Sequence, residues 1–403
     1  MPIAKGTAKV VAYKKETTWG TAAGASGGQQ LRRVTADFNL VKETYESNEI
    51  RTDHQVADFR HGVRSAEGTL SGELSPKTYS DFMAALVAKD FASVTLGAAV
   101  TTTVTVSGST YNFVRASGSA ITAGLRVGMV VRFSGLTTSA DNSRNFLVAA
   151  ISADGLTVTC VPLNGVAPTA QGTGTSVTWT APGKVTFSPT SGHTEDSFTV
   201  EQWFADIAQS EVFTGMRVGS MNVALPSTGI TTVDFGFMGK DLTQKGTTQY
   251  FSSPTAQGTQ GIFAAVNGVM LVGGTPVALV TSADMAVERA METATAVGSN
   301  SVAEIFNGRL RVTGNMSVYF QDATFRNYFD NETTVSVVFA LTTGSEATAD
   351  FVTMTLPKVK LGSFTKDDGE LGLVAATSFT ALVNDVTTAG LPASTIQIHD
   401  SAA

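Results

Sequence analysis

The chain has 403 residues, a net charge of −7 and 15% charged residues, and it is rich in Gly, Thr, Ser, Ala and Val. This composition is typical of a β-rich globular protein of two or three domains. The negative charge argues against a protein that reads nucleic acid through its phosphates, the single cysteine excludes an intramolecular disulfide and a cysteine zinc site, and no apolar run is long enough to span a membrane.

The first 30 residues are polar and Gly-rich, and they predict an extended N-terminal arm. No apolar run of the kind that directs secretion occurs there, so we expect the chain to fold in a cytoplasm. Charged residues then concentrate in residues 31–92. Two strands are predicted in this segment, and the charged residues 46–65 connect them.

A helix is predicted directly after the second strand. Ser75 can cap its start, and Pro76 suits the first helical position, where the missing N–H costs no hydrogen bond. Apolar side chains then recur at helical spacing on one stripe, which we interpret as the face that packs on a sheet. The stripe consists of Tyr79, Phe82, Met83, Leu86 and Val87.

The composition changes abruptly between residues 93 and 182, where charged side chains become sparse among Thr, Ser, Gly and Val. Short β runs, such as residues 127–133 and 156–161, alternate there with turn signals. We therefore expect an inserted small β domain, a sandwich or a barrel. Its one cysteine, Cys160, ends an apolar strand run and is expected to be buried and unreactive.

Three stretches of the chain recur further along it in the same order, which indicates a duplication. In the longest of them, a strand with alternating apolar residues precedes a cap and an amphipathic helix in both copies. The offset between the copies changes where the inserted domain lies, so two independent signals mark the same insertion. The pairs are residues 35–38 with 282–285, residues 62–83 with 308–329, and residues 219–221 with 362–364.

The predicted fold is thus mainly β, with two duplicated β-sandwich or barrel units, each flanked by an α-helix, and an inserted small β domain. Two like units present two like surfaces, which suits ring and tube building better than a single catalytic cleft. The predicted parts are an N-terminal arm (1–30), a first unit in two pieces (31–92 and 183–250), the inserted domain (93–182), a second unit (251–395) and a C-terminal tail (396–403).

Three stretches near the start of the chain carry a family resemblance. They read Glu-Thr-Thr-Trp-Gly at residues 16–20, Asn-Glu-Ile-Arg-Thr-Asp-His-Gln-Val-Ala-Asp-Phe-Arg-His-Gly at residues 48–62, and Glu-Gly-Thr-Leu-Ser-Gly-Glu-Leu-Ser-Pro at residues 67–76. Over residues 1–90 the chain resembles the major tail tube proteins of bacteriophages with long, non-contractile tails, the siphophage tail tube family. The resemblance implies a β-sandwich flanked by a helix, whose long strands join across subunits into a closed barrel.

The resemblance implies a structural subunit of the virion tail rather than an enzyme, assembled in the host bacterial cytoplasm. It implies that rings of six tube domains stack around a lumen that conducts DNA during ejection. A duplicated chain completes such a ring as a homotrimer with pseudo-sixfold symmetry, and hexameric rings of whole chains are the alternative. The implied partners are further copies of the chain, a tape-measure protein, tail initiator and terminator proteins, and double-stranded DNA that passes without sequence-specific binding. No cofactor, metal or membrane is implied, and the inserted domain is expected on the tube exterior.

The loop that bridges one ring to the next is expected at residues 46–65. Its charged residues are candidates for salt bridges, which set register and partner choice more than affinity. Two of its histidines, seven residues apart, suggest a metal site, but no regular element places them on one face. The candidates for inter-ring or inter-subunit contacts are Glu49, Arg51, Asp53, His54, Asp58, Phe59, Arg60 and His61.

A second interpretation is a β-rich module that binds carbohydrate or a surface through its inserted domain. That function needs an aromatic patch, for which the insert offers only a few residues. An enzyme is not predicted, because the sequence has no phosphate-binding loop, no nucleophile elbow with a suitable histidine, and no acidic cluster at strand ends. The candidate aromatic residues of the insert are Tyr111, Phe113, Phe133, Phe146 and Trp179.

Overall fold

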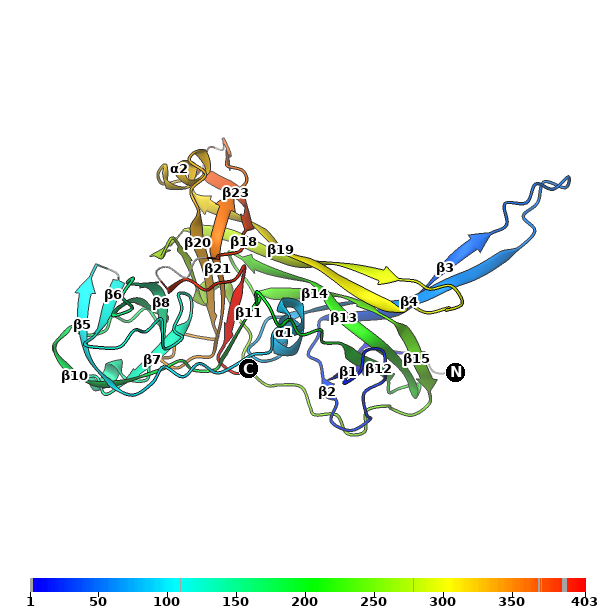
Figure 1. Cartoon of the computed structure of the whole chain (residues 1–403), viewed down its shortest axis with the longest axis horizontal. Coiled ribbons are helices and arrows are strands. Elements are labelled where there is room, and N and C mark those ends of the chain that lie inside the picture. The colour runs from blue at the N-terminus through cyan, green and yellow to red at the C-terminus, as the bar shows by residue number, and fades with distance from the viewer. Residues whose placement is uncertain (1–2, 109, 278, 369, 371, 386–389) are drawn as a thin grey trace.

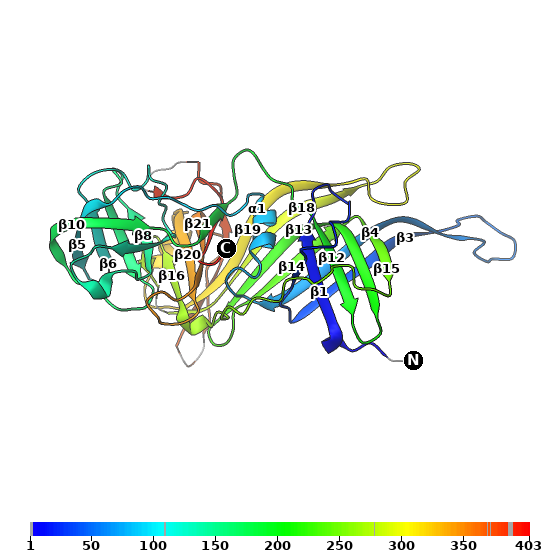
Figure 2. The same cartoon turned by 90° about the horizontal axis from the view of Figure 1, so that it is seen from below.

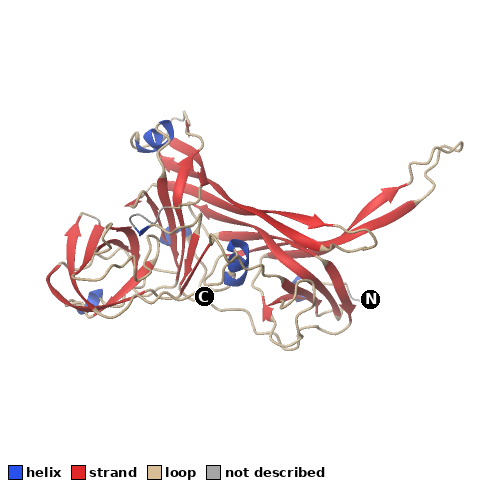
Figure 3. Ribbon diagram, in the orientation of Figure 1, coloured by secondary structure: helices blue, strands red, loops and turns tan. Residues whose placement is uncertain are grey.

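The computed structural model describes residues 3–108, 110–277, 279–368, 370, 372–385 and 390–403. Strands make up most of the regular structure in this part of the chain (Figure 3), which confirms the predicted mainly β fold. The two α-helices found there are α1 (Ser80–Val87) and α2 (Thr324–Asp330).

Two sheet units follow each other along the chain (Figure 1). The first unit contains β1 (Lys9–Lys15), β2 (Gln29–Gln30), β3 (Thr35–Glu46), β4 (Phe59–Glu73), α1, β12 (Phe198–Phe204), β13 (Gln209–Pro226), β14 (Thr232–Gly239) and β15 (Asp241–Gly246). The second unit contains β16 (Gly268–Val272), β17 (Thr275–Pro276), β18 (Val280–Ala294), β19 (Glu304–Tyr319), α2, β20 (Val335–Thr342), β21 (Phe351–Leu361), β22 (Thr365–Lys366) and β23 (Val374–Ala381).

The two units have the same strand pairing. In the first unit, antiparallel hydrogen bonds join β2, β1, β12, β13, β14, β4 and β3 in that order. In the second unit they join β17, β16, β20, β21, β23, β19 and β18 in that order. An α-helix follows the corresponding strand in each unit, β4 or β19. This matching connectivity confirms the predicted duplication of a sheet unit with a flanking helix.

The long hairpins β3–β4 and β18–β19 also share their register. A bulge interrupts the pairing after Lys42 in β3 and after Arg289 in β18, at equivalent places. Gly68 lies opposite Phe38, and a Cβ on Gly68 would come within 2.1 Å of the Phe38 ring. Gly314 occupies the same position in the second hairpin. The glycine that recurs in the sequence is therefore required by close packing across the hairpin.

The two units are joined into one sheet by β13 and β18. Residues 220–226 of β13 pair with residues 288–282 of β18, on the edge of β13 that is not occupied by β14. A continuous sheet of long strands thus runs from β3 through β4, β14, β13, β18 and β19 to β23. One face of this sheet covers the main hydrophobic core.

The helix α1 is buried in that core, as the apolar stripe predicted. Phe82, Leu86 and Val87 are fully inaccessible to solvent. The predicted cap is wrong, however, because α1 begins at Ser80 and not directly after Ser75. Lys77 adopts a left-handed backbone conformation with φ 66°, which delays the helix.

The chain termini are not an arm and a tail. β1 lies within the predicted arm but pairs with β12, and its residues Val11 and Ala12 are buried. β24 (Gln397–Asp400) lies within the predicted tail but pairs with β11 (Lys184–Phe187) and with β21. Residues 25–30 contact residues 252–255, so the segment after β15 lies against the first unit. These partners are far away in sequence, which is why local composition did not reveal them.

The segment expected to be an inserted domain forms a closed six-stranded barrel, and its strand order is β10, β5, β6, β9, β8 and β7. Its core stacks Phe113 on Phe133 with ring centroids 4.0 Å apart. The barrel lies at one end of the molecule and the β3–β4 hairpin projects at the other (Figure 2). Its strands are β5 (Val100–Ser107), β6 (Thr110–Arg115), β7 (Val130–Ser134), β8 (Phe146–Ile151), β9 (Thr157–Pro162) and β10 (Gln171–Thr180).

Candidate assembly surfaces

The outer half of the β3–β4 hairpin projects away from the rest of the chain (Figure 1). Residues 41–46 and 48–61 are all exposed, so every predicted contact candidate lies on an accessible surface. The N–H of Ser47 donates to the carbonyl of Asp58 at 2.9 Å and closes the pairing before the turn. Apolar side chains are exposed there as well, and Ile50 is completely so. Exposed apolar residues on a projecting hairpin are typical of an interaction site.

Two ion pairs join charged residues of the hairpin to each other. Nε and Nη2 of Arg51 donate to the two carboxylate oxygens of Asp53 at 3.0 and 2.8 Å, and these bonds lower the pKa of Asp53. Nε of Arg60 donates to Oδ2 of Asp58 at 2.8 Å. Glu49 forms no ion pair within the described residues. Because all these groups are exposed, the pairs shape the hairpin more than they stabilise it.

The remaining candidates lie along the same hairpin. His54 is at the turn, where its φ of 55° places it in the left-handed region. Phe59 packs edge-on against His61, with ring centroids 5.4 Å apart. No group of three or more His, Cys, Asp or Glu in the described ranges is arranged to hold a metal ion.

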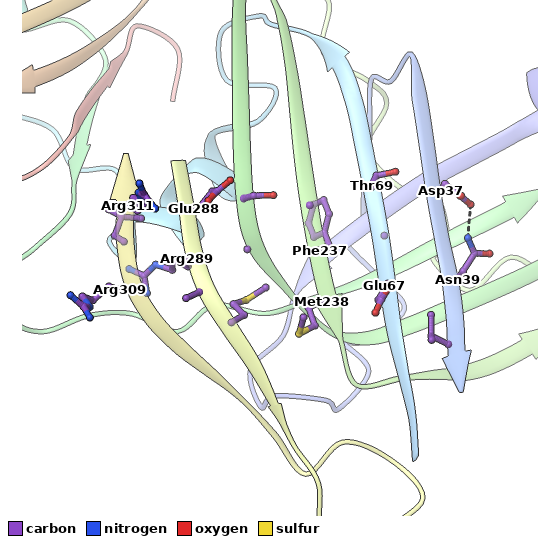
Figure 4. A pocket seen from close by; sticks show the side chains of 18 residues that line it. Asp37, Asn39, Glu67, Thr69, Phe237, Met238, Glu288, Arg289, Arg309 and Arg311 are labelled. Carbon is purple, nitrogen blue, oxygen red and sulfur yellow. Dashed lines mark hydrogen bonds between the residues drawn. The ribbon is translucent and has the colours of Figure 1, made fainter. Parts of the chain in front are cut away.

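The long-strand sheet has a polar face on the side opposite the main core. Six strands, from β3 across to β19, line a trough of about 1190 Å3 on this face (Figure 4). Thr, Ser, Asn and Gly fill most of the positions between the charges, and Asn39 donates to Asp37 at 2.8 Å. The lining of the trough contains three acidic and three basic residues: Asp37, Glu67 and Glu288 with Arg289, Arg309 and Arg311. Glu73, Asp234 and Asp284 add acidic groups on the same face outside the trough.

The outer edge of β3 is open. Within the described residues β3 pairs only with β4, although the equivalent strand β18 is paired on both edges. An open edge presents unpaired N–H and C=O groups that a further strand can bind. Sequence reasoning missed this edge and the acidic face. The alternation at Asp37 and Asn39 was a signal for an exposed strand face, but no local signal gives the order of strands in the sheet.

A family model described as phage tail tube protein matches residues 6–381. The chain belongs to the phage tail tube protein family. Its fold agrees with the match, which spans both sheet units and the barrel between them. No curated protein matches the chain. As a member of this family, the protein is a structural tail tube subunit that assembles with its own copies into the tube of a virion tail.

The described residues of the barrel do not form the aromatic patch that a carbohydrate-binding module needs. Phe113, Phe133 and Phe146 are fully buried in the barrel core, and Trp179 is 3% exposed. Nε1 of Trp179 donates to the hydroxyl of Thr102 at 3.0 Å inside the barrel. These aromatic residues therefore hold the barrel together.

Two further residues of the tail tube protein with potential reactivity, Cys160 and His399, are also buried. Cys160 is completely inaccessible, and burial raises the pKa of its thiol. Burial lowers the pKa of His399 from 6.5 to about 4, which keeps its imidazole neutral at pH 7. No helix in the described part of the chain is both long and apolar enough to cross a membrane.

Proposed function

We propose that this tail tube protein polymerises into stacked rings around a DNA-conducting lumen, in a phage tail of the long, non-contractile type. Each ring contains three chains and has pseudo-sixfold symmetry, because each chain supplies two equivalent units. The observation that carries the proposal is the sheet shared by the two units: β13 and β18 join them edge to edge within one chain. Repeating such a junction around a circle produces a closed wall without free strand edges.

The acidic face of the long-strand sheet is the surface that lines the lumen. A wall of Thr, Ser and Asn with an excess of carboxylates repels the phosphates of DNA, so that double-stranded DNA passes without adhering. The opposite face of the sheet is occupied by the core. In the second unit, β16, β20 and β21 lie on the far side of that core, and the barrel packs on their outer face. This arrangement supports an exterior position for the barrel.

The projecting β3–β4 hairpin is the element that bridges one ring to the next. Its apolar residues Ile50, Val56 and Phe59 are at least half exposed in the single chain, and they gain cover only from another subunit. The fixed pairs Arg51–Asp53 and Arg60–Asp58 give the hairpin a defined charge pattern for that contact. A tape-measure protein and tail initiator and terminator proteins complete the expected set of partners, and assembly takes place in the host cytoplasm.

Electron microscopy of the purified full-length protein tests this function. We expect hollow tubes whose end-on averages show threefold symmetry with six similar lobes. Tubes with true sixfold rings of whole chains would contradict the three-chain ring but keep the tube. A protein that stays monomeric at every concentration, with or without a tail initiator complex, would contradict the function itself.

A further inference from the structure

The junction between the two units within the chain is complete on both sides. β13 is paired with β14 on one edge and with β18 on the other. Side chains on the core face of this junction are buried: Met221 of β13 is 1% exposed, and Val287 of β18 is inaccessible. The pairing register of this junction is therefore known residue by residue.

One half of an identical junction lies at the open edge of β3. Equivalent pairing in the two hairpins places Asn39 of β3 at the position of Ala286 in β18, and Leu40 at the position of Val287. Leu40 is only half-buried, although Val287 has no exposed surface. Within the described residues, no strand covers the edge of β3 that corresponds to the edge of β18 covered by β13. Side-chain donors reach two carbonyls of β3: Nε2 of Gln202 donates to that of Phe38 at 2.8 Å, and Nζ of Lys9 donates to that of Ala36 at 2.7 Å.

The other half lies at the end of β21 and in β22. Leu361 faces Phe379 as Val218 faces Phe237 in the first unit, so β21 and β22 together occupy the place of β13. Phe364 stands at the position of Met221 and is half-buried. Within the described residues, β22 pairs only with β23, so its other edge is open.

We propose that these two open edges bind each other between copies of this chain, and that residues 363–366 of one subunit pair with residues 41–38 of the next. The inference rests on the proposed ring and names the surfaces that close it. The register is that of the internal junction: Thr365 lies opposite Asn39, as Asn222 lies opposite Ala286. Phe364 and Leu40 then cover each other on the core face, as Met221 and Val287 do.

Charged residues support the same register. In the internal junction, Nη2 of Arg217 lies 3.0 Å from a carboxylate oxygen of Glu304. The equivalent residues at the open edges are Lys360 and Asp58, which have the same pair of charges. In the single chain Asp58 is 2.8 Å from Nε of Arg60, and Lys360 is 2.9 Å from a carboxylate oxygen of Glu332. In the proposed junction Asp58 keeps Arg60 as a neighbour and also meets Lys360, so the base of the hairpin contributes to the contact within the ring.

A second cation, Lys42, also has an equivalent in the internal junction. Nε of Arg289 in β18 donates to the carbonyl of Leu86 in the last turn of α1, at 2.6 Å. Lys42 is the equivalent residue of β3 and is exposed. In the proposed junction it meets the end of α2 on the neighbouring subunit, where Asp330 and Glu332 stand. A cation is favoured at a helix C-terminus, and the two carboxylates add to that attraction.

The register also brings one unfavourable pair together. Asp367 stands opposite Asp37 on the polar face, at the place where Ala224 faces Asp284 in the internal junction. Like charges directly opposite each other weaken a strand pair. Asp367→Asn is therefore expected to lower the protein concentration needed for assembly severalfold.

Disulfide cross-linking tests the register. Side chains directly opposite on neighbouring strands are close enough for a disulfide, and the only native cysteine, Cys160, is buried. We expect the double variant N39C/T365C to give covalent oligomers that end at the trimer once rings have formed. N222C/A286C reproduces the pair inside one chain and serves as the geometric control. N39C/S363C is displaced by two residues on the same face and should cross-link far less.

The outcomes separate the junction from the function. Tubes seen by electron microscopy whose N39C/T365C chains stay uncross-linked, or cross-link no better than N39C/S363C, would overturn the register and leave the tube intact. Cross-linked rings that never stack would support the junction and contradict the tube. A chain that never assembles would overturn both.

Charge reversal provides a second measurement that needs no cysteine. Lys360→Glu places two acidic groups together in the proposed junction, and it should raise the concentration needed for assembly about fivefold. The double variant K360E/D58K restores opposite charges and should recover most of that loss. If K360E/D58K assembles no better than K360E, the pairing of Lys360 with Asp58 is wrong.

Discussion

At the scale of single residues, His399 shows how the barrel is attached to the sheet units. Its Nδ1 accepts the N–H of Val130 at 3.0 Å, and its Nε2 lies 2.6 Å from the carbonyl of Pro182. Both bonds require a neutral imidazole with its proton on Nε2, because Nδ1 must be free to accept. The ring edge packs on Phe351, with centroids 5.0 Å apart.

This histidine predicts a loss of stability in mild acid. Burial lowers its pKa in the folded protein from 6.5 to about 4, so the unfolded chain binds the proton more readily. The contribution of neutral His399 to the free energy of unfolding is fully present above pH 6.5 and is lost as the pH falls toward 4. Between pH 7 and pH 5 we expect the free energy of unfolding to fall by about 2 kcal/mol from this group. Urea unfolding at the two pH values measures it.

Two variants isolate the effect. His399→Gln should be less stable at pH 7, and its stability should change less between pH 7 and pH 5 than that of the unaltered protein. His193→Gln replaces an exposed histidine and should behave like the unaltered protein. The neighbouring Asp400 has a pKa raised by burial, which acts in the opposite direction, and it is present in all three proteins. Equal pH dependence in all three would contradict the role of His399.

Residue burial was predictable where a local pattern carried it. The burial of the apolar stripe along α1 and the burial of Cys160 were both expected from the sequence. In the structure these side chains are at most 2% exposed. The prediction placed His399 in a tail. In the structure its contacts are with residues 130, 182 and 351, which are distant in sequence. No spacing or composition signal marks contacts of that range.

At the scale of secondary structure, the β3–β4 hairpin supports a prediction about stacking. The triple variant I50S/V56S/F59S removes apolar side chains that are at least half exposed in the single chain. We expect the free energy of unfolding to change by less than about 0.5 kcal/mol, because surface substitutions rarely exceed that value. Rings should still form, but their stacking into tubes should be lost, as electron microscopy and sedimentation can show.

The second hairpin provides the matched control. Val297 lies between β18 and β19 and is fully exposed, as Ile50 is in the first hairpin. Val297→Ser should leave stacking unchanged, because the second hairpin extends less far from the body than the β3–β4 hairpin does (Figures 1 and 2). Normal tubes from I50S/V56S/F59S would show that the first hairpin does not bridge rings through these side chains.

Elements were predictable when repetition supported them. The strand and helix of residues 62–83 could be recognised because the same pattern recurs at residues 308–329, and the structure gives both copies the same pairing and bulge. The start of α1 was missed, because Asp400 accepts the N–H of Lys77 at 2.8 Å and the hydroxyl of Ser80 at 3.0 Å. A terminal strand distant in sequence thus fixes where the helix begins.

At the scale of the whole molecule, the two units differ in what covers their outer strands. Glu201 of β12 is buried and accepts the N–H groups of Tyr250 and Phe251 at 2.6 and 2.9 Å. Val338 holds the equivalent position in β20 and packs against the barrel. A polar segment covers the first unit, and an apolar domain surface covers the second. The duplicated units have therefore specialised for different neighbours.

This specialisation changes what removal of the barrel should do. In the second unit, the elements that correspond to those on either side of the barrel follow each other directly in the chain. This suggests that the first unit folds without residues 93–182. The deletion, however, uncovers Leu271, Val338 and Phe351, which are at most 1% exposed in the complete chain. Each such side chain costs about 1.5–3 kcal/mol to expose. We expect the deleted chain to aggregate or melt at a lower temperature, and the same deletion with L271T/V338T/F351T to recover soluble protein that forms tubes. Tubes of normal thermal stability from the deletion alone would show that the barrel is not needed to cover the second unit.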